Sequence, residues 1–369
     1  MVYNLEYIRA QARKSFVNAS QKDHRALGRL LISRYSNAVI APAEKGGGGC
    51  FVGEDMRYLE WSNFWNKTTT PPADYSNKEH SVFYCGMFYG CWGHCITDNL
   101  RHIWPIVRNL LPQGLKLAYT TSAINEKLPD NFYALLDQCG IKREDLLYVS
   151  TPTKYKEVWF AEPSYWYDAN LQVRCYTAEF LDTIDLIRGK DCRESSNVQV
   201  QQKIYLSRAG WHTNKPDFGE SYVESAFQSA GYEIVRPEEL SFPELIGMLS
   251  RCNCLAATEG SIAHNALFLP DNAKLVVVRK ANYINDVQMT INQIRDLDVT
   301  IIDAFRDEFI ARPREPWRGP FFVYVSKELA NFLGISKMQF PIALYFRYFL
   351  SFLKMRIRSF FSFIKHNIF

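Results

Sequence analysis

The feature that most constrains the fold is a regular alternation of short apolar runs and amphipathic stretches between residues 203 and 302. Short apolar runs are typical of buried strands, and the stretches between them have helical periodicity. The predicted strands are residues 203–206, 233–235, 254–257, 274–278 and 300–302, and the predicted helices are residues 222–230, 242–250 and 261–268. Strands that alternate with helices form parallel sheets covered by helices, so this half predicts an α/β domain.

The first half of the chain shows the same alternation less regularly. Residues 1–35 have a helical apolar pattern. The glycines at 46–49 predict a turn between strands and not a phosphate loop, because no Gly-Lys-Ser/Thr sequence follows them. Further on, strands are predicted at residues 115–120, 146–149 and 158–161, with a helix at residues 131–139. This half therefore also predicts a mainly parallel sheet with helices on both faces.

A chain of 369 residues exceeds one ordinary hydrophobic core, which indicates two domains. A helix predicted at residues 176–190 and the polar run after it give the boundary. The expected organisation is an N-terminal domain at 1–175, a linking segment at 176–200, a C-terminal domain at 201–335 and a tail at 336–369.

A stretch of ionisable residues lies at the centre of the first domain. His94, Asp98 and His102 recur at intervals of four, so a helix would place them on one face with Arg101 beside them. An imidazole and a carboxylate one turn apart are suited to removing a proton from a bound hydroxyl group. The spacing alone is equally compatible with a surface helix that carries a chance stripe of charge.

Polar residues follow two predicted strands of the second half. Ligands of parallel sheets bind at the carboxyl ends of the strands. Arg208 comes after the strand at 203–206, where its guanidinium can pair with phosphate oxygens.

The second strand end leads through Glu259, Gly260 and Ser261 into a predicted helix that contains His264 and Asn265. Amide groups at a helix start bind anions, and a carboxylate before them can accept hydrogen bonds from ribose hydroxyls. Alternatively, Glu259 and Ser261 cap the helix and His264 packs in the core.

These segments resemble one family. KIYLSRAGW at 203–211, Glu220 and TEGSIAHNALF at 258–268 are similar to motifs of glycosyltransferase family 61, and YGCWGHCITDNLRHIWP at 89–105 resembles the GHxxxDxL motif of the same family. The resemblance covers roughly residues 80 to 280. It implies a GT-B-type fold, in which two Rossmann-like domains face each other across a cleft, and an inverting hexosyl- or pentosyltransferase.

The resemblance also implies roles for the residues named above. The base is Asp98 or His94, and Arg101 and His102 lie on the acceptor side. The donor-binding residues are Arg208, Glu220, Glu259, Gly260, Ser261, His264 and Asn265. Among them, Arg208 and the amides at Gly260 stabilise the nucleotide diphosphate, and Glu259 binds the ribose.

Three positions depart from the family pattern, which leaves the identity of the donor open. Glu259 stands where many members have His, His264 where many have Thr, and Gly219 where Asn often precedes the glutamate. These departures bear on the identity of the donor more than on the reaction type.

No cofactor or metal is expected. Asp296 and Asp298 form a DxD-like pair, but they lie beyond the motif region, and GT-B-type enzymes usually bind the diphosphate without a metal. The nine cysteines lack the spacing of zinc knuckles, and their odd number together with the charged N-terminal stretch fits a reducing cytoplasm.

The tail carries the basic character of the chain. The net charge is +4, and the segment from residue 340 onward has five basic and no acidic side chains, so residues 1–339 carry about −1. A nucleic acid is therefore excluded as a partner. Arg347, Lys354, Arg358 and Lys365 fall on one stripe of an aromatic helix, which predicts binding along an anionic membrane surface. The alternative is a helix that packs on the protein's own body.

Together these features predict a cytoplasmic enzyme that is peripheral on the inner face of the cell membrane. It would move a sugar from a nucleotide-sugar to a glycan or lipid-linked glycan, in the synthesis of capsule, lipopolysaccharide or another cell-surface polysaccharide. The alternatives are another nucleotide-sugar enzyme of the same fold, such as an epimerase or hydrolase, and a non-catalytic membrane-associated assembly protein.

Overall fold

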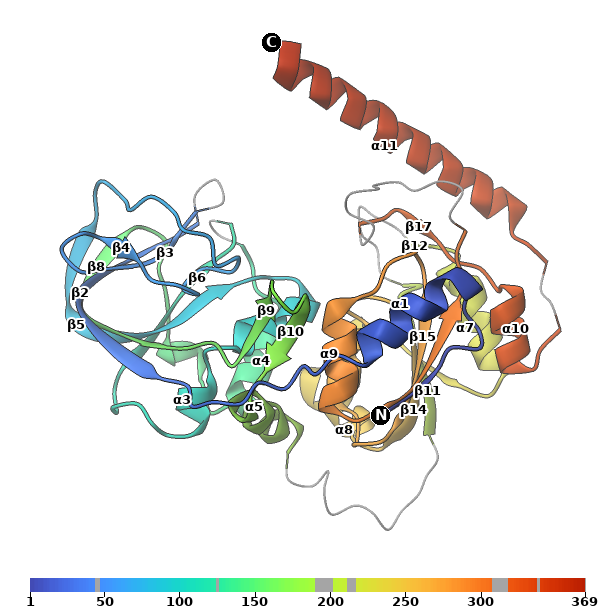
Figure 1. The fold of residues 1–369 in the computed structure, drawn as a ribbon, viewed down its shortest axis with the longest axis horizontal. Helices are drawn as coiled ribbons and strands as arrows, with labels where there is room; N and C mark the ends of the chain where they lie inside the picture. Colours follow the sequence, from blue (N-terminus) through green and yellow to red (C-terminus); the bar gives the residue numbers. More distant parts are fainter. Residues whose placement is uncertain are drawn as a thin grey trace. The chain divides into compact units, whose positions relative to one another are not determined.

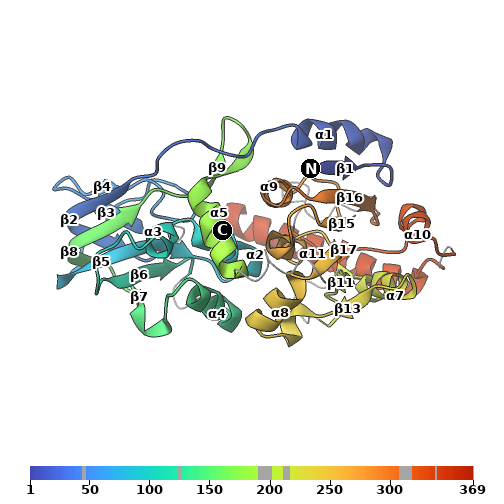
Figure 2. The same ribbon diagram turned by 90° about the horizontal axis from the view of Figure 1, so that it is seen from below.

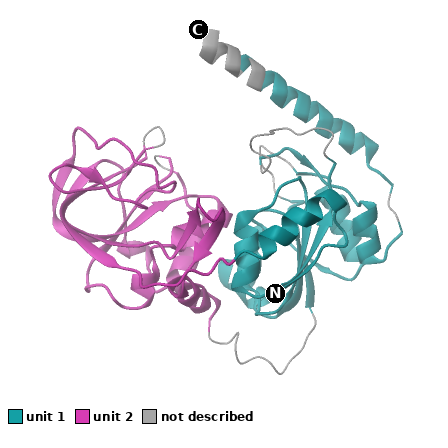
Figure 3. Cartoon of the chain, in the orientation of Figure 1, with its two compact units in different colours: residues 1–22, 196–369 teal, residues 23–195 magenta. Residues whose placement is uncertain are grey.

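The computed structural model describes residues 1–43, 47–123, 126–189, 202–210, 217–306, 318–336 and 339–368 (Figure 1). The chain divides into two compact units (Figure 3). Unit 1 contains residues 1–22 and 196–369, and unit 2 contains residues 23–195. Each unit has its own sheet with helices, so the α/β class is confirmed.

Unit 1 is built on a six-stranded sheet in which all neighbouring strands are parallel, in the order β1-β16-β15-β14-β11-β13 (Figure 2). The strands are β1 (Val2–Asn4), β11 (Gln202–Leu206), β13 (Glu233–Val235), β14 (Cys252–Thr258), β15 (Lys274–Arg279) and β16 (Asp298–Asp303). The central strands are buried along most of their length, as expected for a parallel sheet covered on both faces. The strands predicted in the second half of the chain are therefore confirmed.

Helices and short helical turns cover the sheet of unit 1. They are α1 (Ala10–Ser20), α7 (Glu220–Ser229), η3 (Pro237–Glu239), α8 (Phe242–Leu249), η4 (Ala263–Phe268), α9 (Asp286–Ile294) and α10 (Lys327–Leu333). α7 and α10 pack on the face that carries Tyr205, Val276 and Ile302, where they form one apolar core. The predicted helix at 261–268 is only partly correct, because a short 3₁₀ helix takes its place.

Two further elements complete unit 1. β12 (Asp217–Phe218) pairs in parallel with β17 (Phe321–Phe322), and the long helix α11 (Ile342–Ile368) begins beside them. The rings of Tyr345 and Tyr348 lie 5.0 and 5.6 Å from that of Phe322, so the start of α11 is packed on the unit. None of the described helices, α11 included, combines the length and apolar character needed to cross a bilayer.

The helical prediction for residues 1–35 is wrong outside α1. Residues 2–4 form the edge strand β1 of unit 1, and β2 begins at Ile32 in unit 2. Val2 and Tyr3 are residue types that favour strands, and β16 supplies the missing partner. Gly28 has a φ of 146°, which no residue in a right-handed helix adopts, so the apolar residues around it form an extended lead-in to β2.

Unit 2 contains a seven-stranded mixed sheet in the order β4-β3-β2-β8-β5-β6-β7. The strands are β2 (Ile32–Ala41), β3 (Gly49–Val52), β4 (Arg57–Tyr58), β5 (Ser76–Phe88), β6 (Lys116–Thr121), β7 (Leu146–Tyr148) and β8 (Thr153–Ala161). β8, β5, β6 and β7 are parallel, whereas β2, β3 and β4 are antiparallel. The mainly parallel sheet predicted here is thus only partly correct, because a meander extends it on one side.

The turn predicted at the glycine run joins β2 to β3, an antiparallel pair that a short connection can link. Gly48 and Gly49 have φ values of 104° and 121°, which glycine adopts without strain. Gly46 lies outside the described residues. The hairpin turn is therefore confirmed at its described end.

The remaining elements of unit 2 lie mostly after β5. The helical segments are α2 (Trp92–Cys95), η1 (Asp98–Leu100), α3 (Trp104–Val107), α4 (Asp130–Gln138), η2 (Arg143–Asp145) and α5 (Ala178–Arg188), and β9 (Tyr165–Asp168) and β10 (Val173–Tyr176) form a hairpin. α5 is the helix predicted at 176–190. Residues 190–201, which follow it, lie outside the described residues.

Candidate active site

A chain of hydrogen bonds in unit 2 joins His94, Asp98 and Arg174. His94 Nδ1 lies 2.8 Å from Asp98 Oδ2, and Arg174 donates to Asp98 Oδ1 at 2.8 Å. Both oxygens of the carboxylate are therefore engaged, one by an imidazole and one by a guanidinium. A carboxylate on one ring nitrogen favours the tautomer in which the other nitrogen, Nε2, can accept a proton.

The continuous helix predicted through this stretch is wrong. It is divided into α2, η1 and α3, and Thr97 between the first two has φ −128° and ψ −88°, outside the helical range. The Thr97 hydroxyl donates to the carbonyl of Gly93 at 2.7 Å and thereby stabilises the break. His94 and Asp98 still meet, whereas His102 belongs to a different environment.

Burial and charge act in opposite directions on Asp98. Burial alone would raise the pKa of this carboxyl, since only 4% of the residue is exposed. The charge of Arg174 and the hydrogen bond from His94 reverse that effect and hold the pKa well below its ordinary value. Asp98 is thus ionised at neutral pH and suited to orienting His94.

Aromatic rings hold the imidazole of His94 in place. The ring of Phe64 lies 4.9 Å from it and that of Tyr89 5.0 Å, both edge to face. The side chain of His94 nevertheless remains 27% exposed. It is therefore fixed in orientation and open to solvent, as a proton acceptor must be.

Arg101 and His102 are buried and bonded to the protein itself. Arg101 donates to the carbonyls of Trp61, Asn63 and Phe64, which ties down the loop after β4. His102 Nδ1 lies 2.8 Å from the carbonyl oxygen of Ala161, and its Nε2 accepts from Arg101 Nε at 3.0 Å.

The pKa of His102 is well below its ordinary value, chiefly because of burial and then because of the Arg101 charge, so this ring is neutral. Neither residue presents a side chain for direct acceptor binding in this arrangement. Their contacts instead hold the loop that carries Phe64, the residue packed on His94.

A second cluster of polar and charged side chains lies in unit 1, at the carboxyl ends of the parallel strands. Glu220, the first residue of α7, is buried, and its Oε1 accepts from the Tyr205 hydroxyl at 2.6 Å and from the Arg208 amide at 3.4 Å. Its Oε2 is buried and has no hydrogen-bond partner in the described structure. Burial raises the pKa of Glu220 to about 7, and the nearby Asp217 charge adds to the increase.

Asp217 connects two basic side chains of this cluster. Lys280, directly after β15, donates to Asp217 Oδ2 at 2.9 Å, and Arg208, after β11, lies 3.6 Å from the same oxygen. Lys280 is almost fully buried, and its ammonium lies 4.5 Å from the centre of the Phe321 ring. Two cations thus share one carboxylate at the carboxyl ends of the strands, where ligands of parallel sheets bind.

Glu259 also lies at the carboxyl ends of the strands, directly after β14. It is buried, with an Oε2 atom that makes no hydrogen bond in the described part of the chain. Burial raises the pKa of Glu259 to about 7, although the charges of Arg279 and Lys280 act against the increase. Arg279 is itself bound to Asp303, at 2.5 Å.

The residues after Glu259 differ from the prediction. The segment from Gly260 makes a turn, with Gly260 at a φ of 117°, and only then enters the 3₁₀ helix η4. A 3₁₀ helix of this length has a smaller macrodipole than the predicted α-helix, so the anion site predicted at the amides of this turn would lack that contribution. His264 and Asn265 are buried within η4, and Ser261 lies in the turn before it.

Several members of these clusters were missed by sequence reasoning. Arg174 and Lys280 carry no local motif, and they reach their partners only through the fold. Tyr205 lies within the KIYLSRAGW motif, but sequence analysis gave it no role. The described residues contain no group of three or more His, Cys, Asp or Glu side chains placed to hold a metal ion.

The fold and the candidate site define an α/β protein with a carboxylate-bound, partly exposed histidine in one unit and a polar cluster at the carboxyl ends of the strands in the other. A comparison with protein families matches residues 92–276 to Glycosyltransferase 61. The chain belongs to the glycosyltransferase 61 family and is therefore a glycosyltransferase. The matched segment includes His94, Asp98, Arg208, Glu220 and Glu259. Among curated proteins, no match was found.

Proposed function

We propose that this protein is an inverting glycosyltransferase that moves a sugar from a nucleotide-sugar donor to a glycan or lipid-linked glycan. The observation that carries the proposal is the hydrogen-bonded chain of His94, Asp98 and Arg174 inside the matched family segment. An inverting transfer needs one base that removes the proton of the acceptor hydroxyl, and this arrangement supplies one.

His94 is the base in this proposal, and Asp98 positions it. As the acceptor oxygen attacks the anomeric carbon, its proton passes to His94 Nε2, and the bond between that carbon and the diphosphate oxygen breaks with its electron pair on the diphosphate. The carboxylate of Asp98 stabilises the imidazolium that forms. Asp98 is less suited to be the base itself, because Arg174 and His94 keep its pKa low and both its oxygens are occupied.

Unit 1 binds the donor in this proposal. Arg208 and Lys280 neutralise the negative charge that develops on the departing diphosphate, so the charge of a metal ion is not required. Glu259 Oε2, which is buried and makes no hydrogen bond among the described residues, accepts hydrogen bonds from the ribose hydroxyls. Binding would thereby remove the free-energy cost of a buried acceptor that has no donor. Glu220, Gly260, Ser261, His264 and Asn265 line the donor side.

The all-parallel sheet of unit 1 supports a Rossmann-like nucleotide-binding domain, because ligands of such sheets bind at the carboxyl edge. We therefore propose a GT-B-type enzyme with the acceptor on unit 2. Arg101 and His102 contribute to the acceptor side indirectly, through the loop that they hold.

The membrane is the proposed place of action. α11 has a row of exposed apolar side chains on one face, formed by Ile342, Phe346, Leu350, Leu353 and Ile357. Arg347, Lys354 and Arg358, all exposed, lie beside that row. The side chain of Lys365 lies outside the described residues. An apolar face flanked by basic residues binds anionic lipid, which favours a cytoplasmic, peripheral enzyme of capsule, lipopolysaccharide or other cell-surface polysaccharide synthesis.

The experiment that tests this function is a screen of nucleotide-sugars with glycan and lipid-linked acceptors, followed by NMR of the product's anomeric configuration. The expected product has the configuration opposite to that of the donor. His94→Ala should lower turnover by a factor of about 100 or more and leave donor binding unchanged. The control is His80→Ala, an exposed histidine of the same unit.

Two results would contradict the proposal. Retention of configuration would exclude a single displacement assisted by one base. Release of free sugar without transfer to any acceptor would instead indicate a hydrolase.

A further inference from the structure

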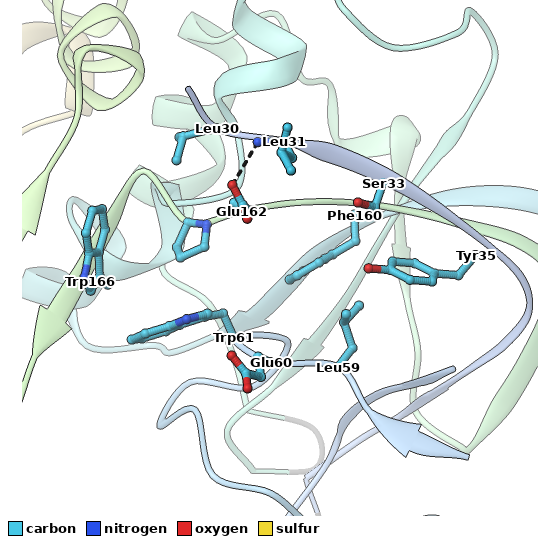
Figure 4. A pocket seen from close by; sticks show the side chains of 11 residues that line it. Leu30, Leu31, Ser33, Tyr35, Leu59, Glu60, Trp61, Phe160, Glu162 and Trp166 are labelled. Carbon is cyan, nitrogen blue, oxygen red and sulfur yellow. Dashed lines mark hydrogen bonds between the residues drawn. The ribbon is translucent and has the colours of Figure 1, made fainter. Parts of the chain in front are cut away.

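A pocket of about 350 Å³ lies in unit 2, apart from the residues assigned above (Figure 4). The lining residues that give it chemical character are Tyr35, Glu60, Trp61, Phe160, Glu162 and Trp166. They come from β2, the loop after β4, the end of β8 and the hairpin strand β9. Its volume is within the range of small-ligand sites.

Aromatic rings form much of the pocket wall. Figure 4 shows Trp61 and Trp166 on one side and Phe160 with Tyr35 on the other, around a shared space. Trp61, Trp166 and Tyr35 are only partly buried, so their ring surfaces are available to a ligand. Flat apolar surface of this kind suits the C–H faces of a pyranose ring.

Two carboxylates supply the polar part. Glu162 is held in place because its Oε2 accepts from the Leu31 amide at 2.9 Å, and Glu60 lies beside Trp61 (Figure 4). Carboxylates accept charge-assisted hydrogen bonds from hydroxyl groups. The lining residues, all within the described structure, include no Lys, Arg or His, so the pocket disfavours phosphates and other anions.

Two wall residues are carried by the segments that build the proton-accepting site. Trp61 is three residues before Phe64, which packs on the His94 ring, and the carbonyl of Trp61 accepts from Arg101. Trp166 lies on β9, opposite Cys175 of β10, and the neighbouring residue of β10 is Arg174, which binds Asp98. A glycan in the pocket and a hydroxyl at His94 would thus contact the same loop and the same hairpin.

We infer that this pocket binds a pyranose unit of the acceptor glycan, at a position other than the reacting sugar. The inference rests on the proposed function, because it assumes that unit 2 binds the acceptor. The aromatic walls would cover the apolar face of the sugar ring, and Glu60 and Glu162 would accept from its hydroxyls.

The test is saturation-transfer NMR with methyl glycosides and disaccharides of glucose, galactose, xylose and N-acetylglucosamine, without donor. At least one probe should bind the full-length protein, and Trp166→Ala should weaken that binding by about tenfold or more, as expected for an aromatic residue at the centre of a contact. Trp166→Phe should restore most of it. Tyr167→Ala is the matched control, because Tyr167 is the next residue of β9, is exposed and does not line the pocket.

Kinetic constants and the binding of further variants distinguish acceptor binding in the pocket from other roles of these residues. With an active acceptor, Trp166→Ala and Glu60→Gln should raise KM for the acceptor and leave kcat and donor binding unchanged. His94→Ala should keep glycan binding, so retained binding in this variant supports the pocket whether or not transfer is lost. Equal glycan binding by wild type, Trp166→Ala and Tyr167→Ala would overturn the inference. Displacement of the glycan probes by tetramethylammonium would also overturn it, in favour of a cation site.

Discussion

Replacing Glu220 with glutamine should stabilise unit 1 at pH 8 and have little effect at pH 5. The carboxyl of Glu220 is buried, and its pKa is about 7, raised mainly by burial. At pH 8 the folded protein therefore holds a buried carboxylate, for which only Oε1 has hydrogen-bond donors in the described structure. Glutamine keeps the shape of the side chain and the acceptor for the Tyr205 hydroxyl, and it carries no charge.

The magnitude follows from the shift of the pKa. A group whose pKa is raised by folding binds more protons in the folded state than in the unfolded state, so stability falls as pH rises. The fall begins near the unfolded value of 4.5 and is complete above about 7. At about 1.4 kcal/mol per pH unit, the difference between variant and wild type should shift by about 2 to 3 kcal/mol in favour of the variant between pH 5 and pH 8.

Hydrogen exchange measured by mass spectrometry can report this shift for unit 1 alone. Peptides from β11 and β14 should exchange about 50-fold more slowly in Glu220→Gln than in wild type at pH 8, and at nearly equal rates at pH 5. The comparison is made at one pH at a time, so the pH dependence of intrinsic exchange cancels. Glu239→Gln, an exposed change in the same unit, is the control.

A ratio of exchange rates that is the same at both pH values would contradict this expectation. Such a result would mean that Glu220 ionises alike in the folded and unfolded chain. A ratio that changes in the opposite direction would mean that the carboxylate is stabilised by its surroundings, with Lys280 outweighing burial.

Four further predictions concern other parts of the molecule. Arg174→Gln should raise the pKa of Asp98, because burial is then less opposed, and should lower turnover by about 10- to 100-fold; an unchanged pH–rate profile would argue against the positioning role. Lys280→Ala should weaken nucleotide diphosphate binding more than nucleoside binding in calorimetry, and equal weakening would make it structural. Gly219→Ala should lower the free energy of unfolding by about 2 kcal/mol or more, since φ is 95° and the new Cβ would lie 1.9 Å from a carbonyl oxygen; a wild-type urea midpoint would contradict this. Deleting residues 340–369 should release the protein from anionic vesicles while soluble-acceptor transfer continues, unless the truncated chain unfolds.

The central parallel strands of unit 1 were predictable because most of their residues are buried and form short apolar runs, whereas the partly exposed edge strand β1 was not predicted. β11, β14 and β15 show this pattern in their central residues. β2 was not predicted, because its first half alternates in burial and its main partner β8 lies more than 100 residues further along the chain. Local periodicity does not register a partner at that distance.

The contacts of the candidate site likewise fall into two kinds, those between residues close in sequence and those between residues far apart. The contact between His94 and Asp98 spans four residues, so spacing alone indicated it even though the predicted helix is broken. The partner on the other oxygen of Asp98 is 76 residues away, and Lys280 is 63 residues from Asp217. Long-range ion pairs of this kind have no local sequence signal, so they emerge only when the sheets are assembled.

The edge strand β1 has a consequence for how the chain is made. Tyr3 is opposite Val299 in the sheet of unit 1, so the ribosome must add all of unit 2 and about two thirds of unit 1 before this strand can pair. At about 5 to 20 residues per second, the interval is about 15 to 60 s. Unit 2, encoded between the two parts, can complete its own sheet during that time. The first residues must therefore avoid other strands until β16 emerges, and a strand of only three residues limits the hydrogen bonds that a wrong partner could make.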